Sequence, residues 1–264
     1  MAWYFPRRHS NSNTIQQIAI GLAKSTDLEV FIAGTFGPVP ALNVTSDNNV
    51  FTSIFSKHQL LMFWPQAKHH RWRLDGEQIR RYHLGDALDP SLTWWEKTEL
   101  GKRECAFYVF RSGASLAALV CEDLARIDPV QPALRAIGPN LVIVLLMDGP
   151  QLERRWPGRY ATVLADDPGS AVLTLTSIGM VNRAASLGGE DHREVALWKE
   201  LGGFAQALPL PRGFHGLLLT LSTSWEEHFS LDTRSDGKTS RRLSLGGVRP
   251  VRSLVSHEWL DERQ

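Results

Sequence analysis

Residues 140–148, with the sequence NLVIVLLMD, place the strongest constraint on how this chain can fold. The run is too short to span a membrane, and it is too continuously apolar for a strand with one face in water. It therefore predicts a fully buried strand. A second buried strand is predicted at residues 170–178, and a helix with a break at Pro157 is predicted between the two, over residues 149–169. Buried strands that alternate with helices predict an α/β layered core.

The first quarter of the chain predicts a helix, a strand and a hairpin. Apolar side chains recur at helical spacing over residues 14–25, and a β-rich run follows at residues 28–36. Two short apolar runs, residues 49–56 and 59–66, are joined by Lys-His, which is typical of an antiparallel hairpin. We therefore expect Lys68 to lie at the end of a strand.

Cys121 ends the apolar run of residues 115–121 and is followed at once by Glu122 and Asp123. This arrangement allows two interpretations. A cysteine set at the tip of a strand can act as a nucleophile, whereas a free cysteine is commonly a small buried side chain of the core. A neighbouring carboxylate disfavours the thiolate unless it points away or pairs with Arg126. We expect Asp123 to cap the helix that follows.

Charge and cysteine content argue against several classes of function. Lys and Arg total 29 against 28 Asp and Glu, so the net charge of +1 gives no general attraction for nucleic acid or anionic lipid. The basic stretches at residues 80–86 and 240–252 are interpreted as solvated loops. The two cysteines are too few for a disulfide framework, and we find neither a signal peptide nor a membrane-spanning run. We therefore expect a cytoplasmic protein without a membrane or nucleic-acid partner.

Two further regions lie outside these elements. Residues 69–104 are rich in charge and aromatic side chains with weak periodicity, which favours a long irregular segment that carries function. Within it, His69 and His70 are adjacent, and adjacent side chains on a strand point to opposite faces, so we predict no metal site and no cofactor. The last third has period-two stretches and a turn at Asp236-Gly237, which predicts strands at the sheet edges.

The order of these features resembles one known family. A strand ending in FIAGT, a hairpin, a strand-end lysine, a strand ending in LVCED, the run NLVIVLLMD and a helix with Arg-Tyr-Ala follow one another. From the helix at residues 14–25 onward, this order resembles the nitrilase superfamily of carbon–nitrogen hydrolases. The resemblance implies a four-layer αββα sandwich and a catalytic Glu-Lys-Cys set in that chain order.

Carried over by position, the resemblance assigns roles to individual residues. Cys121 would be the nucleophile, Lys68 would stabilise the oxyanion, and the main-chain N–H of Glu122 would be a second oxyanion donor. Many members have a further acid about ten residues after the lysine that supports it. The best match is Glu77, and Asp75 and Glu96 are alternatives.

The general base of the family is the main departure. In the family it belongs to a Pro-Glu pair at the end of the second strand, and this sequence contains no such pair. Glu29 stands at the start of the strand that matches the third strand of the family, so it is either a substitute base or a solvated charge at the strand entry. The resemblance therefore implies an N-terminally incomplete sandwich that lacks the first two strands and the first helix.

Three explanations remain open for the missing part. It is supplied by sequence upstream in a longer protein, the start site is misassigned, or the chain is a reduced, inactive relative. We expect one nitrilase-like domain over residues 1–264, in which residues 1–13 form an irregular entry segment.

Two classes of function follow from the resemblance. The first is a carbon–nitrogen hydrolase domain that acts on a small non-peptide amide or nitrile through a cysteine thioester, and that is inactive alone if its base lies elsewhere. The second is a non-catalytic scaffold or sensor domain in a larger assembly with a fused or associated upstream module. The stretches KHHRWRLD and MDGPQL resemble nitrilase-like domains fused to bacterial reverse transcriptases in phage defence. The family commonly pairs into dimers, so we also expect a homo-oligomer.

Overall fold

The computed structural model describes residues 2–5, 12–25, 27–36, 48–98, 103–110, 113–185, 191–237 and 240–253. Its helices and strands confirm the α/β class that the sequence predicts. Contacts divide the chain into two compact units. The first unit comprises Met1–Tyr108, Ala117–Ala133 and Val144–Leu146, and the second comprises Val109–Leu116, Leu134–Ile143 and Met147–Gln264. Over the described residues, no helix has the length and apolar character that a membrane crossing requires.

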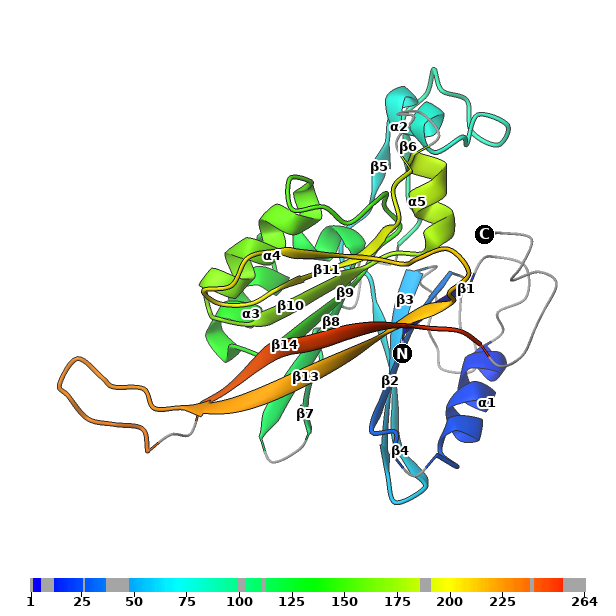
Figure 1. The fold of residues 1–264 in the computed structure, drawn as a ribbon. Helices are drawn as coiled ribbons and strands as arrows, with labels where there is room; N and C mark the ends of the chain where they lie inside the picture. Colours follow the sequence, from blue (N-terminus) through cyan, green and yellow to red (C-terminus); the bar gives the residue numbers. More distant parts are fainter. Residues whose placement is uncertain are drawn as a thin grey trace. The chain divides into compact units, whose positions relative to one another are not determined.

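A four-stranded sheet with the order β1-β2-β3-β4 lies within the first unit (Figure 1). The predicted hairpin is confirmed, because β3 and β4 are antiparallel. Lys57 and His58 join them with positive φ angles of 47° and 65°, which is the two-residue turn that follows the twist of a hairpin. The strands are β1 (Ala2–Phe5), β2 (Val30–Phe36), β3 (Asn48–Ser56) and β4 (Gln59–Ala67).

Strand β1 corrects the expectation of an irregular entry segment. It runs parallel to β2, with Ala2 beside Ile32 and Phe5 beside Thr35. Helix α1 (Ser12–Leu22) then begins two residues before the start that the periodicity predicts. A strand of four residues contains too few alternations to be recognised from its pattern, and its backbone pairing with β2 is a long-range contact that a sequence does not display.

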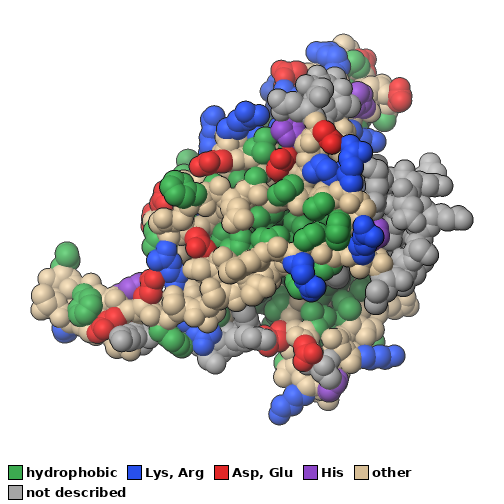
Figure 2. Space-filling view, viewed as in Figure 1, with side chains coloured by type: hydrophobic (Ala, Val, Ile, Leu, Met, Phe, Trp, Pro, Cys, Tyr) green, Lys and Arg blue, Asp and Glu red, His purple; other side chains and the backbone are tan. Residues whose placement is uncertain are grey.

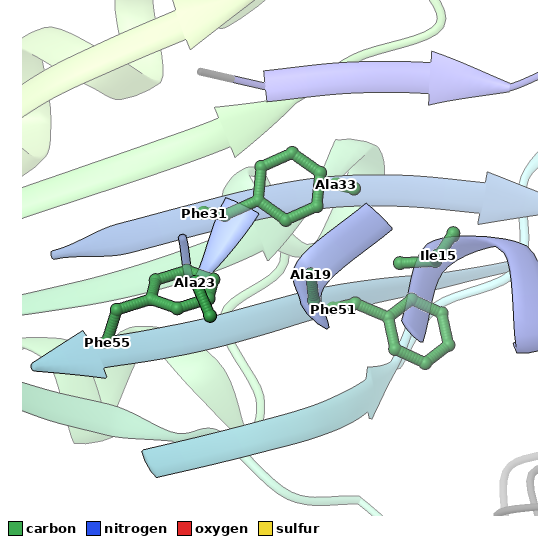
Figure 3. Close-up of a cluster of buried hydrophobic side chains, with 7 residues drawn as sticks. All are labelled: Ile15, Ala19, Ala23, Phe31, Ala33, Phe51 and Phe55. Carbon is green, nitrogen blue, oxygen red and sulfur yellow. The ribbon is translucent and has the colours of Figure 1, made fainter. Parts of the chain in front are cut away.

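Helix α1 packs its apolar face on this sheet (Figure 3). Ile15 and the small residues Ala19 and Ala23 meet Phe31 of β2 and Phe51 of β3, and all five are buried. Residues 15 and 19 lie one turn apart on one face of α1. Ala23 directly follows the helix, and its N–H donates to the Ala19 carbonyl at 3.0 Å. This packing confirms the helix that the sequence predicts and forms the apolar core of the first unit.

Replacing Phe51 with alanine is expected to reduce the free energy of unfolding by about 3–5 kcal/mol, because the change leaves a large cavity in this core. Phe51 is 0% exposed and stacks on Phe63 with ring centroids 5.2 Å apart. Urea denaturation followed by circular dichroism measures the difference. Leu61, which is 61% exposed on β4, is the matched control, and its change to alanine should cost less than about 0.5 kcal/mol. Equal losses in the two variants would contradict the assignment of this core.

The segment after β4 is more regular than the sequence predicts. Helix α2 has a capping box, in which Asp75 accepts a hydrogen bond from the Gln78 N–H at 2.9 Å and the Gln78 side chain accepts one from the Asp75 N–H at 3.2 Å. The Asp-x-x-Gln spacing was a readable signal for this helix start. The elements are β5 (Arg73–Leu74), α2 (Gly76–Arg81) and β6 (Trp94–Trp95), and β5 pairs with β6 in antiparallel register.

A second sheet has the order β12-β11-β10-β9-β8-β7. Its strands are β7 (Phe107–Phe110), β8 (Ala114–Val120), β9 (Leu141–Leu145), β10 (Ala171–Leu175), β11 (Glu194–Lys199) and β12 (Gln206–Pro209), with helices α3 (Val130–Ile137), α4 (Trp156–Asp166) and α5 (Ile178–Ala185). The two buried strands predicted from the sequence are confirmed as β9 and β10. Pro157 does not break a helix, because it stands in the first turn of α4, where a proline lacks only an N–H that has no helical acceptor.

The last strands also differ from expectation. Strands β13 (Gly216–Glu226) and β14 (Ser240–Val251) pair with each other as a separate two-stranded sheet rather than extending an edge of the six-stranded one (Figure 1). Alternation along a strand reports which face is buried and does not report the neighbouring strand.

Candidate active site

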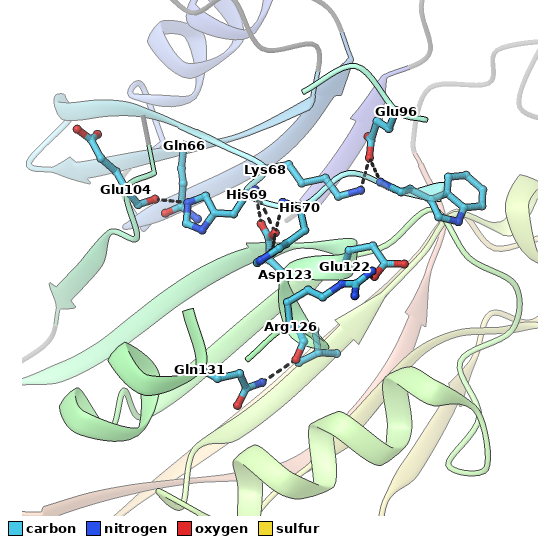
Figure 4. Close-up of polar contacts among 12 residues, drawn as sticks. Gln66, Lys68, His69, His70, Glu96, Glu104, Glu122, Asp123, Arg126 and Gln131 are labelled. Atoms are coloured by element: carbon cyan, nitrogen blue, oxygen red, sulfur yellow. Dashed lines mark hydrogen bonds and ion pairs between the residues drawn. The ribbon is translucent and has the colours of Figure 1, made fainter. Parts of the chain in front are cut away.

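Lys68 directly follows β4, as the sequence predicts, and is almost fully buried at 1% exposure. Its main-chain N–H donates to the carbonyl of Asn48 on β3 at 2.9 Å, which holds the residue in line with the strand. Its Nζ donates to the Glu96 carboxylate in an ion pair (Figure 4). A buried ammonium must be paired to remain charged, so the ion pair with Glu96 stabilises the charged form of Lys68.

Glu96 is held on both carboxylate oxygens. Oε1 accepts from Asn48 Nδ2 at 2.8 Å, and Oε2 accepts from the main-chain N–H of Trp72 at 3.0 Å as well as from Lys68. Its own N–H donates to the Trp72 carbonyl at 2.8 Å, next to the β5–β6 pairing. These bonds fix the carboxylate before any ligand is present, and through it they fix the position of Nζ.

Among the three acids considered from the sequence, Glu96 therefore contacts Lys68, and Glu77 does not. Glu77 is on the exposed side of α2 and pairs with Arg81 one turn later. Asp75 is the N-cap of the same helix. The family resemblance favoured Glu77 for its distance from the lysine along the chain, whereas the observed partner lies 28 residues away.

Cys121 lies at a strained turn. It follows β8, begins the short 3-10 helix η2 (Cys121–Leu124), and has a φ of +48°. A left-handed conformation at a residue with a Cβ costs on the order of 1–3 kcal/mol, and such strain is concentrated at functional sites. The turn after a strand that the sequence predicts is confirmed, and the thiol residue is buried at 9% exposure.

Asp123 joins the cysteine turn to the end of β4 (Figure 4). Its carboxylate is 0% exposed, and it accepts from the N–H of His69 at 3.0 Å and from the N–H of His70 at 3.1 Å. Nδ1 of His70 also lies 3.0 Å from Oδ1. The sequence predicted a helix cap, and the structure instead shows a link between the two segments that carry Lys68 and Cys121.

Gln66 adds a second link between the same two segments. Its side chain is 3% exposed, donates to the Ala118 carbonyl of β8 at 2.9 Å, and accepts from the Ala106 N–H at 2.8 Å. His69, for its part, contacts the Glu104 carbonyl through Nε2 at 2.8 Å. The end of β4 is therefore anchored on both sides of Lys68.

Glu122 forms the ion pair with Arg126 that limits the effect of its charge on the Cys121 thiol. Its carboxylate pairs with Nε of Arg126 at 3.3 Å, one turn along the chain. Its N–H lies in the first turn of η2, where an N–H has no acceptor within the helix. The helix itself therefore does not use that N–H.

The charges of the site favour an ammonium on Lys68. Burial lowers its pKa most strongly of any single influence, but the negative charges of Cys121, Glu96 and Asp123 together outweigh burial, so the pKa of Lys68 is raised. The negative charge of Cys121 is the largest of the influences that raise the pKa of Lys68.

Cys105 is the second thiol in the first unit, and its surroundings oppose ionisation. Burial, and then the charge of Asp123, raise the pKa of Cys105 to about 11. In a Cys121→Ser variant, alkylation of Cys105 by iodoacetamide should rise about tenfold per pH unit between pH 8 and 10, because only the thiolate reacts. In urea, where the pKa returns toward 9.0, the rate at pH 8 should be about 100-fold higher. Equal rates in the folded and unfolded chain would contradict this.

Glu29 lies at the other end of the sheet. Its carbonyl accepts from the Phe55 N–H at 2.8 Å, whereas the carbonyl of Asn48 accepts from Lys68. Phe55 and Asn48 are seven residues apart on β3, which is about 23 Å along a strand. Glu29 therefore cannot serve as a base for Cys121, and the interpretation as a charge at the strand entry holds. Among the described residues, no three His, Cys, Asp or Glu side chains gather as metal ligands.

Comparison with solved structures gives matches of low sequence identity. The glutamine-dependent NAD+ synthetase of Acinetobacter baumannii matches with a TM-score of 0.46 and 13% identity over 76% of this chain and 33% of that one. An amidase of the nitrilase superfamily from Nesterenkonia AN1 matches with a TM-score of 0.46 and 14% identity over 76% of this chain and 66% of that one. An amidase from Nesterenkonia sp. matches with a TM-score of 0.46 and 16% identity over 75% of this chain and 63% of that one. This chain thus spans about a third of the synthetase and just under two thirds of the amidases. No family model and no curated protein matches the sequence.

Proposed function

We propose that residues 1–264 form one nitrilase-like domain of the carbon–nitrogen hydrolase type, which acts on a non-peptide amide or nitrile through a thioester at Cys121. The observation that carries the proposal is the buried Lys68–Glu96 pair at the end of β4, linked by Asp123 to the strained turn of Cys121. A thiolate needs a nearby cation, and a developing oxyanion needs fixed donors. This arrangement offers both.

In the first half-reaction, the Cys121 thiolate attacks the carbonyl carbon of the amide and forms a C–S bond. The resulting oxyanion accepts hydrogen bonds from Nζ of Lys68 and the N–H of Glu122. The C–N bond then breaks, and the nitrogen leaves as ammonia or an amine with the proton that the thiol released, which the general base transfers. Water subsequently attacks the thioester, giving a carboxylic acid and regenerating the thiol. With a nitrile, the thiol adds across the C≡N bond to give a thioimidate, a first water adds to its carbon, and loss of ammonia gives the same thioester, which a second water hydrolyses.

We assign the role of general base to no residue of this chain. By the family resemblance, the base follows the strand that precedes VFIAGT, and β1 lies beside VFIAGT in the place of one of the two strands that the resemblance implied were missing. The residues after β1 are Pro6 and Arg7, a Pro-Arg pair in place of Pro-Glu. Without a general base both half-reactions slow by roughly 100-fold to 10,000-fold. We therefore propose that another segment or module supplies the base, or that this domain turns over poorly alone.

Hydroxylamine offers a test that does not depend on the base, because it attacks thioesters more readily than water does. The chain is incubated with a panel of small amides and nitriles with and without hydroxylamine, and hydroxamate is measured together with the mass of each cysteine peptide. The expected result is hydroxamate formation and an adduct on Cys121, both lost in Cys121→Ser and retained in Cys105→Ser. Labelling of Cys105 as readily as Cys121, or hydroxamate from the Cys121→Ser variant, would contradict the proposal.

A second candidate is a scaffold or sensor role in a larger assembly, such as a phage-defence reverse transcriptase system. It is favoured by the exposed aromatic and apolar side chains of the segment after β4, of which Trp95 is 58% and Leu92 is 54% exposed. In that case a Cys121→Ala variant keeps both its assembly and its biological function. Loss of function with assembly intact would favour the enzyme. The two free cysteines, Cys105 and Cys121, suit the reducing cytoplasm that we propose for either role.

A further inference from the structure

The hairpin β13–β14 has two outer strand edges. Backbone groups on the edge of β14 bond to other residues of the second unit, whereas those on the edge of β13 bond to no described residue. On β14, the N–H of Leu245 donates to Oε2 of Glu200 at 3.0 Å, and the carbonyl of Arg241 accepts from Nδ2 of Asn140 at 2.6 Å. Both backbone groups point away from β13. The outer edge of β14 is therefore held by the second unit itself.

The register then fixes which groups of β13 point outward. Leu245 lies opposite Leu221, and Arg241 lies opposite Trp225. In an antiparallel pair, two opposed residues either exchange both of their backbone hydrogen bonds or direct both sets outward. Leu221, Trp225 and the intervening Thr223 therefore direct their N–H and C=O groups away from β14. Among the described residues, none forms a hydrogen bond with these outward groups.

This open edge lacks the features that normally protect an edge strand. Residues 216–225, GLLLTLSTSW, contain neither a charge nor a proline, and Glu226, the last residue of β13, is paired with Arg242 of β14. Strand β14 itself carries Arg241, Arg242, Arg249 and Pro250. Natural edge strands are usually protected by charges or prolines against pairing with another chain. The side chains on the edge are also open to solvent, with Leu221 38% and Trp225 52% exposed. Figure 2 shows further exposed apolar side chains at the hairpin tip, where Phe229 is 65% exposed.

We propose that β13 pairs with β13 of a second copy of this chain, in antiparallel register about a two-fold axis at Thr223. Thr223 then faces Thr223 of the other copy, and Leu221 faces Trp225 in both directions, so that each opposed pair exchanges two backbone hydrogen bonds. The result is a continuous four-stranded sheet in place of a two-stranded one, which is marginal on its own.

The side chains suit this register. Leu221, Thr223 and Trp225 share one face of the strand, and opposed aromatic and aliphatic side chains on one face stabilise a sheet. The guanidinium of Arg241 lies 4.5 Å from the centroid of the Trp225 ring and holds that ring on the same face. Because residues 216–225 are uncharged, no like charges meet at the two-fold axis.

Two substitutions at Thr223 test the proposal by sedimentation velocity over a wide range of protein concentration. Thr223→Pro removes an outward N–H that the β13–β14 ladder does not use, and Thr223→Lys sets two like charges against each other at the axis. Each variant should raise the dimer dissociation constant by at least about tenfold. Leu231→Lys adds the same charge at the hairpin tip, where Leu231 is fully exposed, and should leave the dimer unchanged. Circular dichroism shows whether each variant is folded.

Cysteine cross-linking tests the register itself, in a background with Cys105→Ser and Cys121→Ser. Thr223→Cys should form a disulfide-linked dimer under mild oxidation, because Cα atoms in a hydrogen-bonded pair lie about 5.5 Å apart. Ser222→Cys, whose side chain points to the other face, should not. A wild-type chain that is monomeric at every concentration, a dimer unaffected by both Thr223 variants, or equal cross-linking at residues 222 and 223 would each overturn the proposal.

Discussion

Replacing Lys68 with methionine is expected to lower the rate of Cys121 acylation by about 100-fold to 1,000-fold, the usual effect of removing one oxyanion donor. Methionine preserves most of the side-chain volume, so the change removes the ammonium without opening a large cavity. Two effects act in the same direction, because Lys68 donates to the oxyanion in the proposed mechanism and its positive charge also stabilises the thiolate. The rate is measured as the burst of amine released from an activated amide.

The matched control for Lys68→Met is Lys24→Met, which removes an exposed lysine from the same unit. It should leave the acylation rate unchanged. The Lys68 variant must also be shown to fold, because it leaves the Glu96 carboxylate without its cation. Asn48 and the Trp72 N–H still bind that carboxylate, which limits the cost. An acylation rate within threefold of the wild type in folded Lys68→Met would contradict the role proposed for the lysine.

The residues of the site differed in how well the sequence predicted them. Lys68 and Cys121 could be placed because each stands at the end of a strand whose pattern is strong. Glu96 could not be chosen from among three acids, because its contact with Lys68 depends on the pairing of β5 with β6, and two-residue strands have no periodicity. Asp123 was recognised as structural, but its partners lie 53 and 54 residues away and no local rule names them.

The same distinction applies to the fold. The strong local signals gave the hairpin of β3 and β4, the helix α1 and the buried strands β9 and β10. Two predictions were wrong, namely an irregular segment in place of β1 and sheet-edge strands in place of the separate β13–β14 ribbon. Both depend on which strand lies alongside, and packing rather than local pattern sets that partner. Pro157 differs from these two cases, because a local rule does explain it. Proline is favoured in the first turn of a helix, and Pro157 stands in the first turn of α4.

Replacing Asp123 with alanine is expected to destabilise the chain by about 2–6 kcal/mol, since the change leaves the N–H groups of His69 and His70 without their buried acceptor, at about 1–3 kcal/mol each. Chemical denaturation measures the loss. Glu122→Ala is the matched control, because Glu122 pairs with the exposed Arg126, and surface pairs contribute less than about 1 kcal/mol. Equal losses in the two variants would contradict the link that Asp123 provides.

Asp123→Asn separates the position of this side chain from its charge. The negative charge of Asp123 raises the pKa of Cys105, so its removal should lower that pKa and speed alkylation of Cys105 at a fixed pH. If Asp123 acted on Cys121 through charge alone, its loss would also favour the thiolate and speed acylation there. If it acts by holding the end of β4 against the cysteine turn, weaker bonds to His69 and His70 slow acylation at Cys121. Opposite changes at the two cysteines would therefore identify Asp123 as a positioning residue, and acceleration at both would refute that role.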